Sequence, residues 1–275
     1  MIRSFALQTG AADSIVIRMW ANALFCVPLM FFAGWHIERK DWPRLIILAC
    51  LCNFGYYVGS IYGFANLSAG AGGMLYATNP LMIVALAITI GQERLSIAVI
   101  LGMVISFAGT LYLFSGGLDG GGGNPIFGGL MMLAACFSWA LYAVFVKTLV
   151  RKYGAVRTTL YSTLLPALPA ALFLNAQTYS TFTHLGVNAL WALAILSLVG
   201  TIFSVNLWNY AAIHLRPSST GASLYLIPPT VALIGWLFLG ETTGPQTLIG
   251  GFIILVGVAV AEFGKTFNPV KARAT

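Results

Sequence analysis

Apolar runs of about 20 residues alternate with short polar connections along almost the whole chain. A run of this length is what an α-helix needs to cross the hydrocarbon core of a bilayer. We predict nine complete spans, at positions 14–33, 43–63, 70–91, 96–114, 126–150, 155–174, 188–214, 218–240 and 247–264. The pattern therefore predicts an all-α polytopic membrane protein, whose longest polar connections are residues 115–124 and 175–187.

The composition supports this interpretation and narrows the partners. Hydrophobic residues make up 59% of the chain and charged residues 8%, and the mean hydropathy is +0.88. A soluble domain of 275 residues needs far less apolar surface. The net charge of +7 comes from basic residues in short loops and not from one patch, so nucleic acid is not an expected partner. The four cysteines lie in apolar segments and are interpreted as structural thiols, and we expect no metal and no cofactor.

Basic residues gather in alternate loops, which predicts the orientation. The connections after the first, third, fifth, seventh and ninth spans, together with the first residues of the spans that follow them, contain Arg39, Lys40, Arg44, Arg94, Arg151, Lys152, Arg157, Arg216, Lys265, Lys271 and Arg273. The connections 66–69, 115–124 and 175–187 contain neither lysine nor arginine. Because cytoplasmic loops are enriched in these residues, the C-terminus is predicted to lie in the cytoplasm.

Two of the predicted spans repeat each other. GGMLYATNPLMIVALAITIG aligns without a gap with GASLYLIPPTVALIGWLFLG, so Tyr76 and Pro80 fall on Tyr225 and Pro229. Proline lacks an N–H and clashes with the carbonyl four residues before it, so each helix is predicted to open beside its tyrosine. Paired, interrupted spans in matching positions of two halves indicate the binding site of a transporter. The alternative is that the prolines merely bend lipid-embedded helices.

The repeat extends beyond these two spans. Gly102 and Gly109 match Gly250 and Gly257 at a constant offset. Glu93 at the cytoplasmic end of its span matches Glu241 at the outer end of its own, so the halves are predicted to be inverted. The predicted domains are a first half at 1–115, a glycine-rich linker at 116–124, an inverted second half at 125–268 and a cytoplasmic tail at 269–275. The second half has five spans, and the first has four, with residues 1–10 resembling the outer end of an incomplete tenth span.

Several motifs resemble the EamA-type transporters of the drug/metabolite transporter superfamily. They are WALYAVFVK from Trp139 to Lys147, Arg18 within IVIRMW, the alanine-rich YGFANLSAGAG and NYAAIHLRPSSTGAS, and the Gly-Glu corner at Gly240 and Glu241. Short loops and tyrosine-rich spans look most like the YddG-type aromatic amino-acid exporters. The resemblance implies an inverted-repeat bundle of ten spans (5+5) in a bacterial inner membrane. It also implies export, a direction that the residues by themselves do not indicate.

Rings and amides in the middles of the spans are the candidate substrate ligands. Aromatic rings with a polar handle suit a ligand that has an apolar body and a few hydrogen-bonding groups. An interfacial belt of tryptophan and tyrosine is the alternative. The predicted substrate-binding residues are Tyr76, Asn79, Tyr225, Trp139, Tyr142, Tyr56, Ser60 and Asn209.

The predicted hinges are prolines and a stripe of glycines. Pro80, Pro228 and Pro229 interrupt the repeated spans, and Gly55, Gly59 and Gly63 are spaced four apart along one span. Such a glycine stripe allows helices to approach closely and slide, although static packing explains it equally well. Arg18 and Lys147 are the internal cations, and the alternatives for each are to pair with a ligand carboxylate or to hold a helix end and snorkel. Lys147, close to the cytoplasmic end, is interpreted as snorkelling, and Arg18, near the outer end of its span, is predicted to be a structural or gating residue.

The predicted function is an alternating-access carrier for small amphiphilic metabolites, above all amino acids with aromatic or apolar side chains, working as an exporter or facilitator. No Asp or Glu lies deep in a span, which disfavours proton coupling through a buried acid. A multidrug or other metabolite carrier of the same superfamily is the alternative. An intramembrane enzyme or a channel is less favoured, because neither clustered catalytic groups nor a ring of charges is visible. The expected partners are the small-molecule substrate and membrane lipids, with a monomer expected and a dimer as the alternative.

Overall fold

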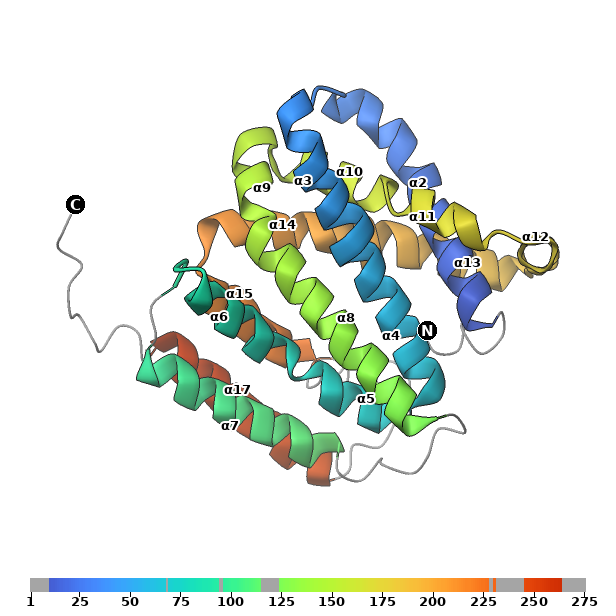
Figure 1. Cartoon of the computed structure of the whole chain (residues 1–275). Helices are drawn as coiled ribbons and strands as arrows, with labels where there is room; N and C mark the ends of the chain where they lie inside the picture. Colours follow the sequence, from blue (N-terminus) through green and yellow to red (C-terminus); the bar gives the residue numbers. More distant parts are fainter. Residues whose placement is uncertain are drawn as a thin grey trace. The chain divides into compact units, whose positions relative to one another are not determined.

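The computed structural model describes residues 10–67, 69–93, 96–114, 124–227, 230 and 245–263. These residues form helices and turns, with no β-strand among them (Figure 1). Their contacts divide the chain into two units. Unit 1 comprises Met1–Asn66 and Gly122–His214, and unit 2 comprises Leu67–Gly121 and Leu215–Thr275. Each unit therefore contains segments from both halves of the sequence.

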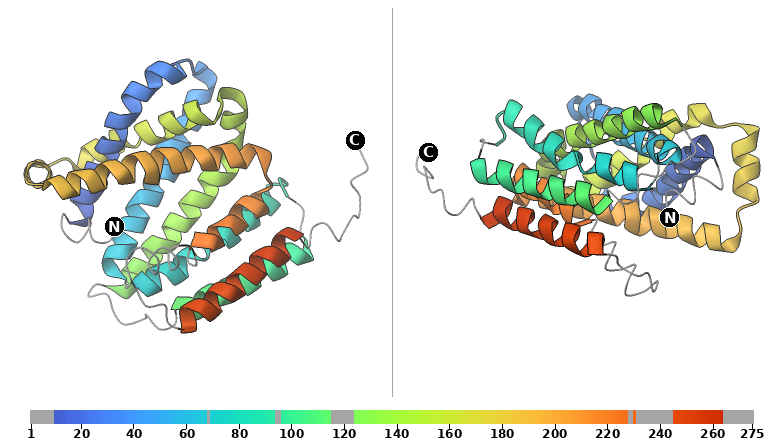
Figure 2. Two further views of the ribbon diagram at one scale, coloured as in Figure 1. Left: turned by 180° about the vertical axis from the view of Figure 1, so that it is seen from behind. Right: turned by 90° about the horizontal axis from the view of Figure 1, so that it is seen from below.

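Unit 1 is built from four long rods, of which α8 (Pro125–Phe145) is one, and a run of shorter helices. Another rod is α2 (Ala11–Ala33), and a third joins α3 (Trp42–Ile46), η2 (Ile47–Asn53) and α4 (Phe54–Asn66). The fourth joins α13 (Val187–Ser197), η5 (Leu198–Phe203) and α14 (Ser204–His214), and Figure 2 shows it from behind. The remaining elements are η1 (Arg39–Asp41), α9 (Lys147–Tyr153), α10 (Ala155–Leu164), α11 (Ala167–Ala170), η4 (Ala171–Phe173) and α12 (Ala176–Thr183).

The glycine stripe of unit 1 lies in a close helix crossing. A Cβ added at Gly59 would lie 2.6 Å from the Met131 carbonyl oxygen, and one at Gly55 would lie 3.0 Å from Ser138 Oγ. Small residues let two helix backbones approach in this way. The contacts of α4 with α8 run antiparallel, and the two helices lie side by side in Figure 1. Gly63 continues the same seam against Met132.

Two stretches of wide, π-type helix interrupt the rods of unit 1. They are η2 and η5, and each shifts the side chains that follow it around the helix axis. In η5 the Thr201 hydroxyl donates to the Leu196 carbonyl, five residues back, at 3.1 Å. Wide turns of this kind are frequent at functional sites. Here they aim Asn53 and Thr201 at neighbouring helices.

Unit 2 contains the interrupted span that the sequence predicted. Its elements are α5 (Ala69–Tyr76), α6 (Asn79–Thr89), α7 (Ile97–Phe114), α15 (Pro217–Ser223), η6 (Leu224–Leu226) and α17 (Pro245–Phe263). The helix breaks at Ala77 and Thr78, and Pro80 stands at the start of α6, where its missing N–H costs no helical hydrogen bond. Pro228 and Pro229, the matching residues of the second half, lie outside the described residues.

A second glycine-lined crossing joins α7 and α17, which run side by side in Figures 1 and 2. A Cβ at Gly102 would lie 2.5 Å from the Gly257 carbonyl oxygen, and one at Gly109 would lie 3.0 Å from that of Gly250. In the sequence repeat, Gly102 corresponds to Gly250 and Gly109 corresponds to Gly257. Exchanging the two repeats therefore converts the contact between Gly102 and Gly257 into the contact between Gly250 and Gly109. Two equivalent helices crossing antiparallel in this way are what an inverted repeat produces.

The predicted all-α polytopic membrane fold is confirmed. Among the described residues, Ala12–Ala33, Arg39–Asn66, Pro125–Phe145 and Ala189–His214 are long and apolar enough to cross a membrane. Ala155–Phe173 and Ala176–Thr183 add a fifth candidate if this pair, bent by 119°, counts as one span. Shorter apolar helices occupy Asn79–Thr89, Ile97–Tyr112 and Leu248–Ala261. Helices coincide with eight of the predicted spans, and 218–240 extends beyond the described residues.

One predicted connection is helical. The sequence predicted residues 175–187 as a polar connection, but α12 occupies most of it. Asn175 caps this helix, since its side-chain oxygen accepts the Thr178 N–H at 2.9 Å. Thr178 and Thr181 in turn donate to the Asp13 carboxylate, which fixes α12 against the start of α2.

Candidate functional site

An aromatic cluster lies inside unit 1. Trp139 on α8 is its centre, with ring centroids 5.2 Å from Tyr56, 5.4 Å from Tyr142 and 5.5 Å from Trp208. Trp139 and Tyr142 are three residues apart on one helix face and stack with an interplanar angle of 28°. The indole N–H groups of Trp139 and Trp208 are buried without a hydrogen-bond partner among the described residues. The structure thus brings together three of the predicted substrate-binding residues.

A buried hydrogen-bond network holds Tyr142 in this cluster. Its phenol oxygen lies 2.9 Å from Ser162 Oγ. The Asn209 side-chain amide donates to this phenol oxygen at 3.0 Å and to Thr159 Oγ1 at 2.9 Å. Tyr142, Asn209, Thr159 and Ser162 are all 0% exposed. Tyr142 lies on α8, Thr159 and Ser162 lie on α10, and Asn209 lies on α14, so the network joins three helices.

Sequence reasoning missed the α10 members of this network. Thr158, Thr159, Ser162 and Thr163 are buried in one turn and a half of an otherwise apolar span. A cluster of hydroxyls inside a membrane helix is itself a signal, because such groups need partners that lipid does not supply. Asn53 also reaches this helix and donates its amide to the Ser162 carbonyl at 2.7 Å.

Ser60, another predicted ligand, is engaged by its own helix. Its hydroxyl donates to the Tyr57 carbonyl at 3.1 Å. Tyr57 itself was not predicted, although its phenol donates to Thr201 Oγ1 at 3.0 Å. The ring of Tyr57 packs 5.5 Å from that of Tyr56, which links it to the Trp139 cluster.

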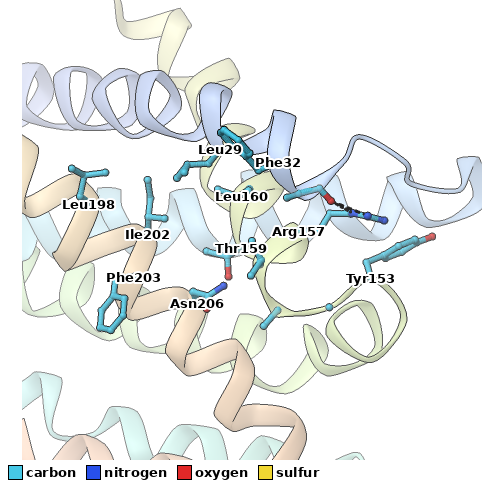
Figure 3. A pocket seen from close by; sticks show the side chains of 14 residues that line it. Leu29, Phe32, Tyr153, Arg157, Thr159, Leu160, Leu198, Ile202, Phe203 and Asn206 are labelled. Atoms are coloured by element: carbon cyan, nitrogen blue, oxygen red, sulfur yellow. Dashed lines mark hydrogen bonds between the residues drawn. The ribbon is translucent and has the colours of Figure 1, made fainter.

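An open pocket of about 660 Å³ adjoins the network (Figure 3). Apolar side chains of α2, α10 and η5 form most of its wall, and Thr159 and Asn206 supply polar groups. Thr159 therefore belongs both to the pocket wall and to the network that reaches Tyr142. Arg157 lies at one end, where its guanidinium donates to the Ala33 carbonyl at 2.8 Å and to the His36 carbonyl at 3.2 Å.

Two of the predicted ligands of unit 2, Asn79 and Tyr225, are buried and have no hydrogen-bond partner among the described residues. Asn79 is 0% exposed and Tyr225 is 1% exposed. Neither the Asn79 amide nor the Tyr225 phenol has a hydrogen-bond partner among the described residues. The Tyr225 ring packs with Ala77 and Met103 in the core of the unit. Tyr76, the repeat partner of Tyr225, is partly buried.

The repeated glutamate and proline of unit 2 both contact α15. Pro80 approaches Gly221, where an added Cβ would lie 3.5 Å from the Pro80 carbonyl oxygen. The Glu93 carboxylate accepts the Ser218 N–H at 2.8 Å and also the Ser218 hydroxyl. A carboxylate at a helix N-terminus pairs with free N–H groups and with the positive end of the helix dipole.

Charged groups of unit 1 gather at the ends of η1 and α9. Lys152 Nζ lies 2.7 Å from Glu38 Oε1 and 2.5 Å from Asp41 Oδ2, and the Tyr153 hydroxyl also donates to Asp41. Hydrogen bonds from Lys152 and, to a lesser extent, from Lys40 lower the pKa of Glu38. Hydrogen bonds from Lys152 and, to a lesser extent, from Tyr153 lower the pKa of Asp41. The same carboxylates, Asp41 first, raise the pKa of Lys152. Within the described residues, no group of three His, Cys, Asp or Glu side chains is placed to hold a metal ion.

Apolar spans that enclose rings, amides and hydroxyls are typical of a membrane transporter, and the comparisons with known proteins identify the family. The EamA-like transporter family matches residues 5–115 and 126–263, so the chain belongs to this family. It is therefore a multi-pass membrane transporter with small-molecule substrates, and not an enzyme.

Relatives and a solved structure are consistent with this assignment. A probable terminal-alkyne amino-acid exporter of Streptantibioticus cattleyicolor is 27% identical over 80% of this chain and 73% of its own. A probable amino-acid metabolite efflux pump of Salmonella typhimurium is 26% identical over 86% of this chain and 78% of its own. A solved crystal structure aligns with a TM-score of 0.75 at 18% identity, covering 97% of this chain and 94% of that one, which shows the fold alone.

Proposed function

We propose that this transporter is an alternating-access carrier for small amphiphilic metabolites, namely amino acids with aromatic or other apolar side chains. The observation that carries the proposal is the pair of buried, unpaired indole N–H groups of Trp139 and Trp208 within a cluster of rings. A ligand with an apolar body and one or two acceptors can stack on these rings and accept from these donors.

The unpaired groups of unit 2 support the same class of ligand. A buried polar group without a partner costs about 1–3 kcal/mol. Asn79 and Tyr225 both carry such groups, and a polar ligand or water recovers that free energy by pairing with them. We therefore retain Tyr76, Asn79 and Tyr225 in unit 2 and Tyr56, Trp139, Tyr142, Ser60 and Asn209 in unit 1 as proposed substrate contacts.

We propose that the interrupted spans move when the carrier changes from one open side to the other. The break before Pro80, matched by Pro228 and Pro229 in sequence, supports a hinge that opens the carrier to one side and then to the other. The tight seam at Gly55, Gly59 and Gly63 supports a surface along which two helices shift. The proposed repeat halves are residues 1–115 and 125–268, joined by the linker 116–124.

The proposed direction of transport and the proposed membrane are based on the relatives. The names of the Streptantibioticus and Salmonella relatives, together with the distribution of lysine and arginine, support amino-acid export across a bacterial inner membrane. In this arrangement the tail 269–275 lies in the cytoplasm, and the carrier acts as a monomer.

Counterflow in proteoliposomes tests the proposal. Vesicles loaded with unlabelled L-phenylalanine should accumulate labelled L-phenylalanine, whereas a sugar, a nucleotide or a cationic drug on the inside should drive no uptake. Trp139→Ala should reduce this exchange at least about tenfold, because a stacking surface is lost. Trp191→Ala serves as the matched control, since Trp191 is 67% exposed on α13 and outside the cluster. Exchange driven equally by a cationic drug would instead support a multidrug carrier.

A further inference from the structure

Arg18 is a buried cation inside unit 1. It lies on α2 with 5% of its surface exposed, and its guanidinium carbon is 5.2 Å from the centre of the Tyr57 ring. Among the described residues, no carboxylate lies within ion-pair distance of it, and no hydrogen bond to it is present. Charged side chains in membrane spans are expensive and are normally paired. The face of a tyrosine ring compensates only part of a full positive charge.

The acidic residue of the same helix does not neutralise Arg18. Asp13 stands five residues earlier, and its carboxylate accepts hydrogen bonds from Thr178 at 2.6 Å and from Thr181 at 3.3 Å. Residues five apart do not share a helix face. Asp13 is therefore committed to α12, and the charge of Arg18 is left for another partner.

Asn22 provides a second, independent observation. It lies one turn beyond Arg18 on the same face of α2, with 1% of its surface exposed. Neither its amide nitrogen nor its amide oxygen has a partner among the described residues. The outer face of this helix is apolar, with Leu24 and Phe31 more than 70% exposed. The helix thus turns a cation and a free amide inward, away from the face that meets lipid.

Arg18 lies beside the aromatic cluster. Tyr57, which faces the guanidinium, packs 5.5 Å from Tyr56, and Tyr56 packs 5.2 Å from Trp139. We propose that Arg18 binds the carboxylate of the substrate, with the Asn22 amide donating to the same group. This inference rests on the proposed function and sharpens it, because it makes a carboxylate a required part of the substrate. Arg18 then acts as a substrate ligand, where the sequence predicted a structural or gating residue.

Competition against a decarboxylated analogue tests the assignment. In proteoliposome counterflow of labelled L-phenylalanine, unlabelled L-phenylalanine should compete at least about thirtyfold better than phenethylamine, which lacks the carboxylate. In Arg18→Gln this ratio should collapse towards one through weaker competition by phenylalanine. Arg18→Lys, which keeps the charge, should restore part of the ratio. Arg151→Gln, at an exposed position on α9, should leave it unchanged.

A binding measurement separates this inference from the proposed function. Phenylacetate and its neutral counterpart phenylacetamide are added to the purified protein in detergent, and Tm is measured. Phenylacetate should raise the Tm of the wild-type protein but not that of Arg18→Gln. Asn22→Ala, in which the cation remains, should reduce the shift and provides a second variant if Arg18→Gln does not fold.

The outcomes are distinct. Stabilisation by phenylacetate through Arg18 without exchange of phenylalanine would retain the carboxylate site and overturn the proposed substrate. Exchange of phenylalanine with an unaltered competition ratio in Arg18→Gln would retain the carrier and overturn the site. Equal loss of phenylalanine and phenethylamine binding in Arg18→Gln would reduce Arg18 to a structural residue. Wild-type protein that neither exchanges phenylalanine nor binds phenylacetate would overturn both.

Discussion

Tyr142 of unit 1 and Tyr225 of unit 2 are buried to nearly the same extent, with 0% and 1% of their surfaces exposed. The Tyr142 phenol is paired with Ser162 and Asn209, whereas the Tyr225 phenol has no partner among the described residues. Asn209 and Asn79 differ in the same way, since only Asn209 is paired. A fully satisfied network fixes its side chains, while unpaired buried groups remain costly until something binds them. We infer that the first network holds Tyr142 and Asn209 in place for contact with the substrate, whereas the unpaired groups of unit 2 are completed by a guest molecule.

The two units nevertheless close-pack their helices by the same means, and breaking that packing should have the largest effect. Gly59→Leu in unit 1 and Gly102→Leu in unit 2 each add a side chain at a position where even a Cβ atom would lie within 2.6 Å of a backbone atom of the neighbouring helix. Each variant should lose about 3 kcal/mol of unfolding free energy, because backbone must move to relieve the clash. Unfolding of purified protein in mixed micelles measures the loss. Gly200→Ala is the control, since its nearest contact is a leucine methyl carbon at 3.8 Å; an equal loss there would contradict the role of the crossings.

Substitution of the paired Asn209 and of the unpaired Asn79 should have opposite effects on stability. Asn209→Leu should destabilise the protein by about 2–3 kcal/mol, because Thr159 and Tyr142 each lose a buried partner. Asn79→Leu should instead raise stability by about 1 kcal/mol, because an unpaired buried amide is replaced by an apolar group of similar size. The same Asn79→Leu protein should exchange substrate poorly in proteoliposomes. Destabilisation by Asn79→Leu equal to that of Asn209→Leu would remove the difference between the units.

Removal of the phenol hydroxyl from Tyr142 or from Tyr225 should change stability less than substitution of the asparagine of the same unit does. Tyr142→Phe should cost about 1 kcal/mol of stability, since it deletes hydrogen bonds to Ser162 and Asn209. Tyr225→Phe should be neutral for stability and should lower the affinity for substrate. Urea or thermal unfolding and equilibrium binding, measured on both proteins, separate these outcomes. A stable Tyr225→Phe variant that exchanges substrate normally would exclude the Tyr225 phenol from substrate binding.

The sequence was sufficient for features that depend on local pattern. The interruption at Ala77 and Thr78, just before Pro80, is present because proline chemistry acts within one turn. The constant offset from Gly102 and Gly109 to Gly250 and Gly257 predicted a repeat, and the structure packs Gly102 against Gly257 and Gly109 against Gly250 across α7 and α17. Both cases rest on residues that constrain the backbone wherever they occur.

The remaining features depend on contacts between distant residues. The partners of Tyr142 lie 20 and 67 residues away, and no periodicity in the sequence selects them. The wide turns of η2 and η5 do not follow from a helix-breaking residue such as proline, and they decide where Asn53 and Thr201 point. Asn22 was overlooked because one amide in an apolar span indicates a site only when its burial and lack of partners are known.

The smallest expected effect concerns the carboxylates that hold helix ends. Asp41 of unit 1 accepts from the Lys152 cation, whereas Glu93 of unit 2 accepts from the neutral N–H and hydroxyl of Ser218. Because Lys152 and Tyr153 lower the pKa of Asp41 below its ordinary value of 3.8, its stabilising contribution is complete above that pH and is lost as the pH falls through the lower, folded-state value. Asp41→Asn should therefore lower Tm slightly at pH 7, and the two Tm values should converge in acid. Added salt should shrink the difference for Asp41→Asn but not for Glu93→Gln, because screening acts on the exposed ion pair. A salt-independent loss at Asp41 would show that its hydrogen bond from Tyr153, rather than the charge of Lys152, stabilises this end of α9.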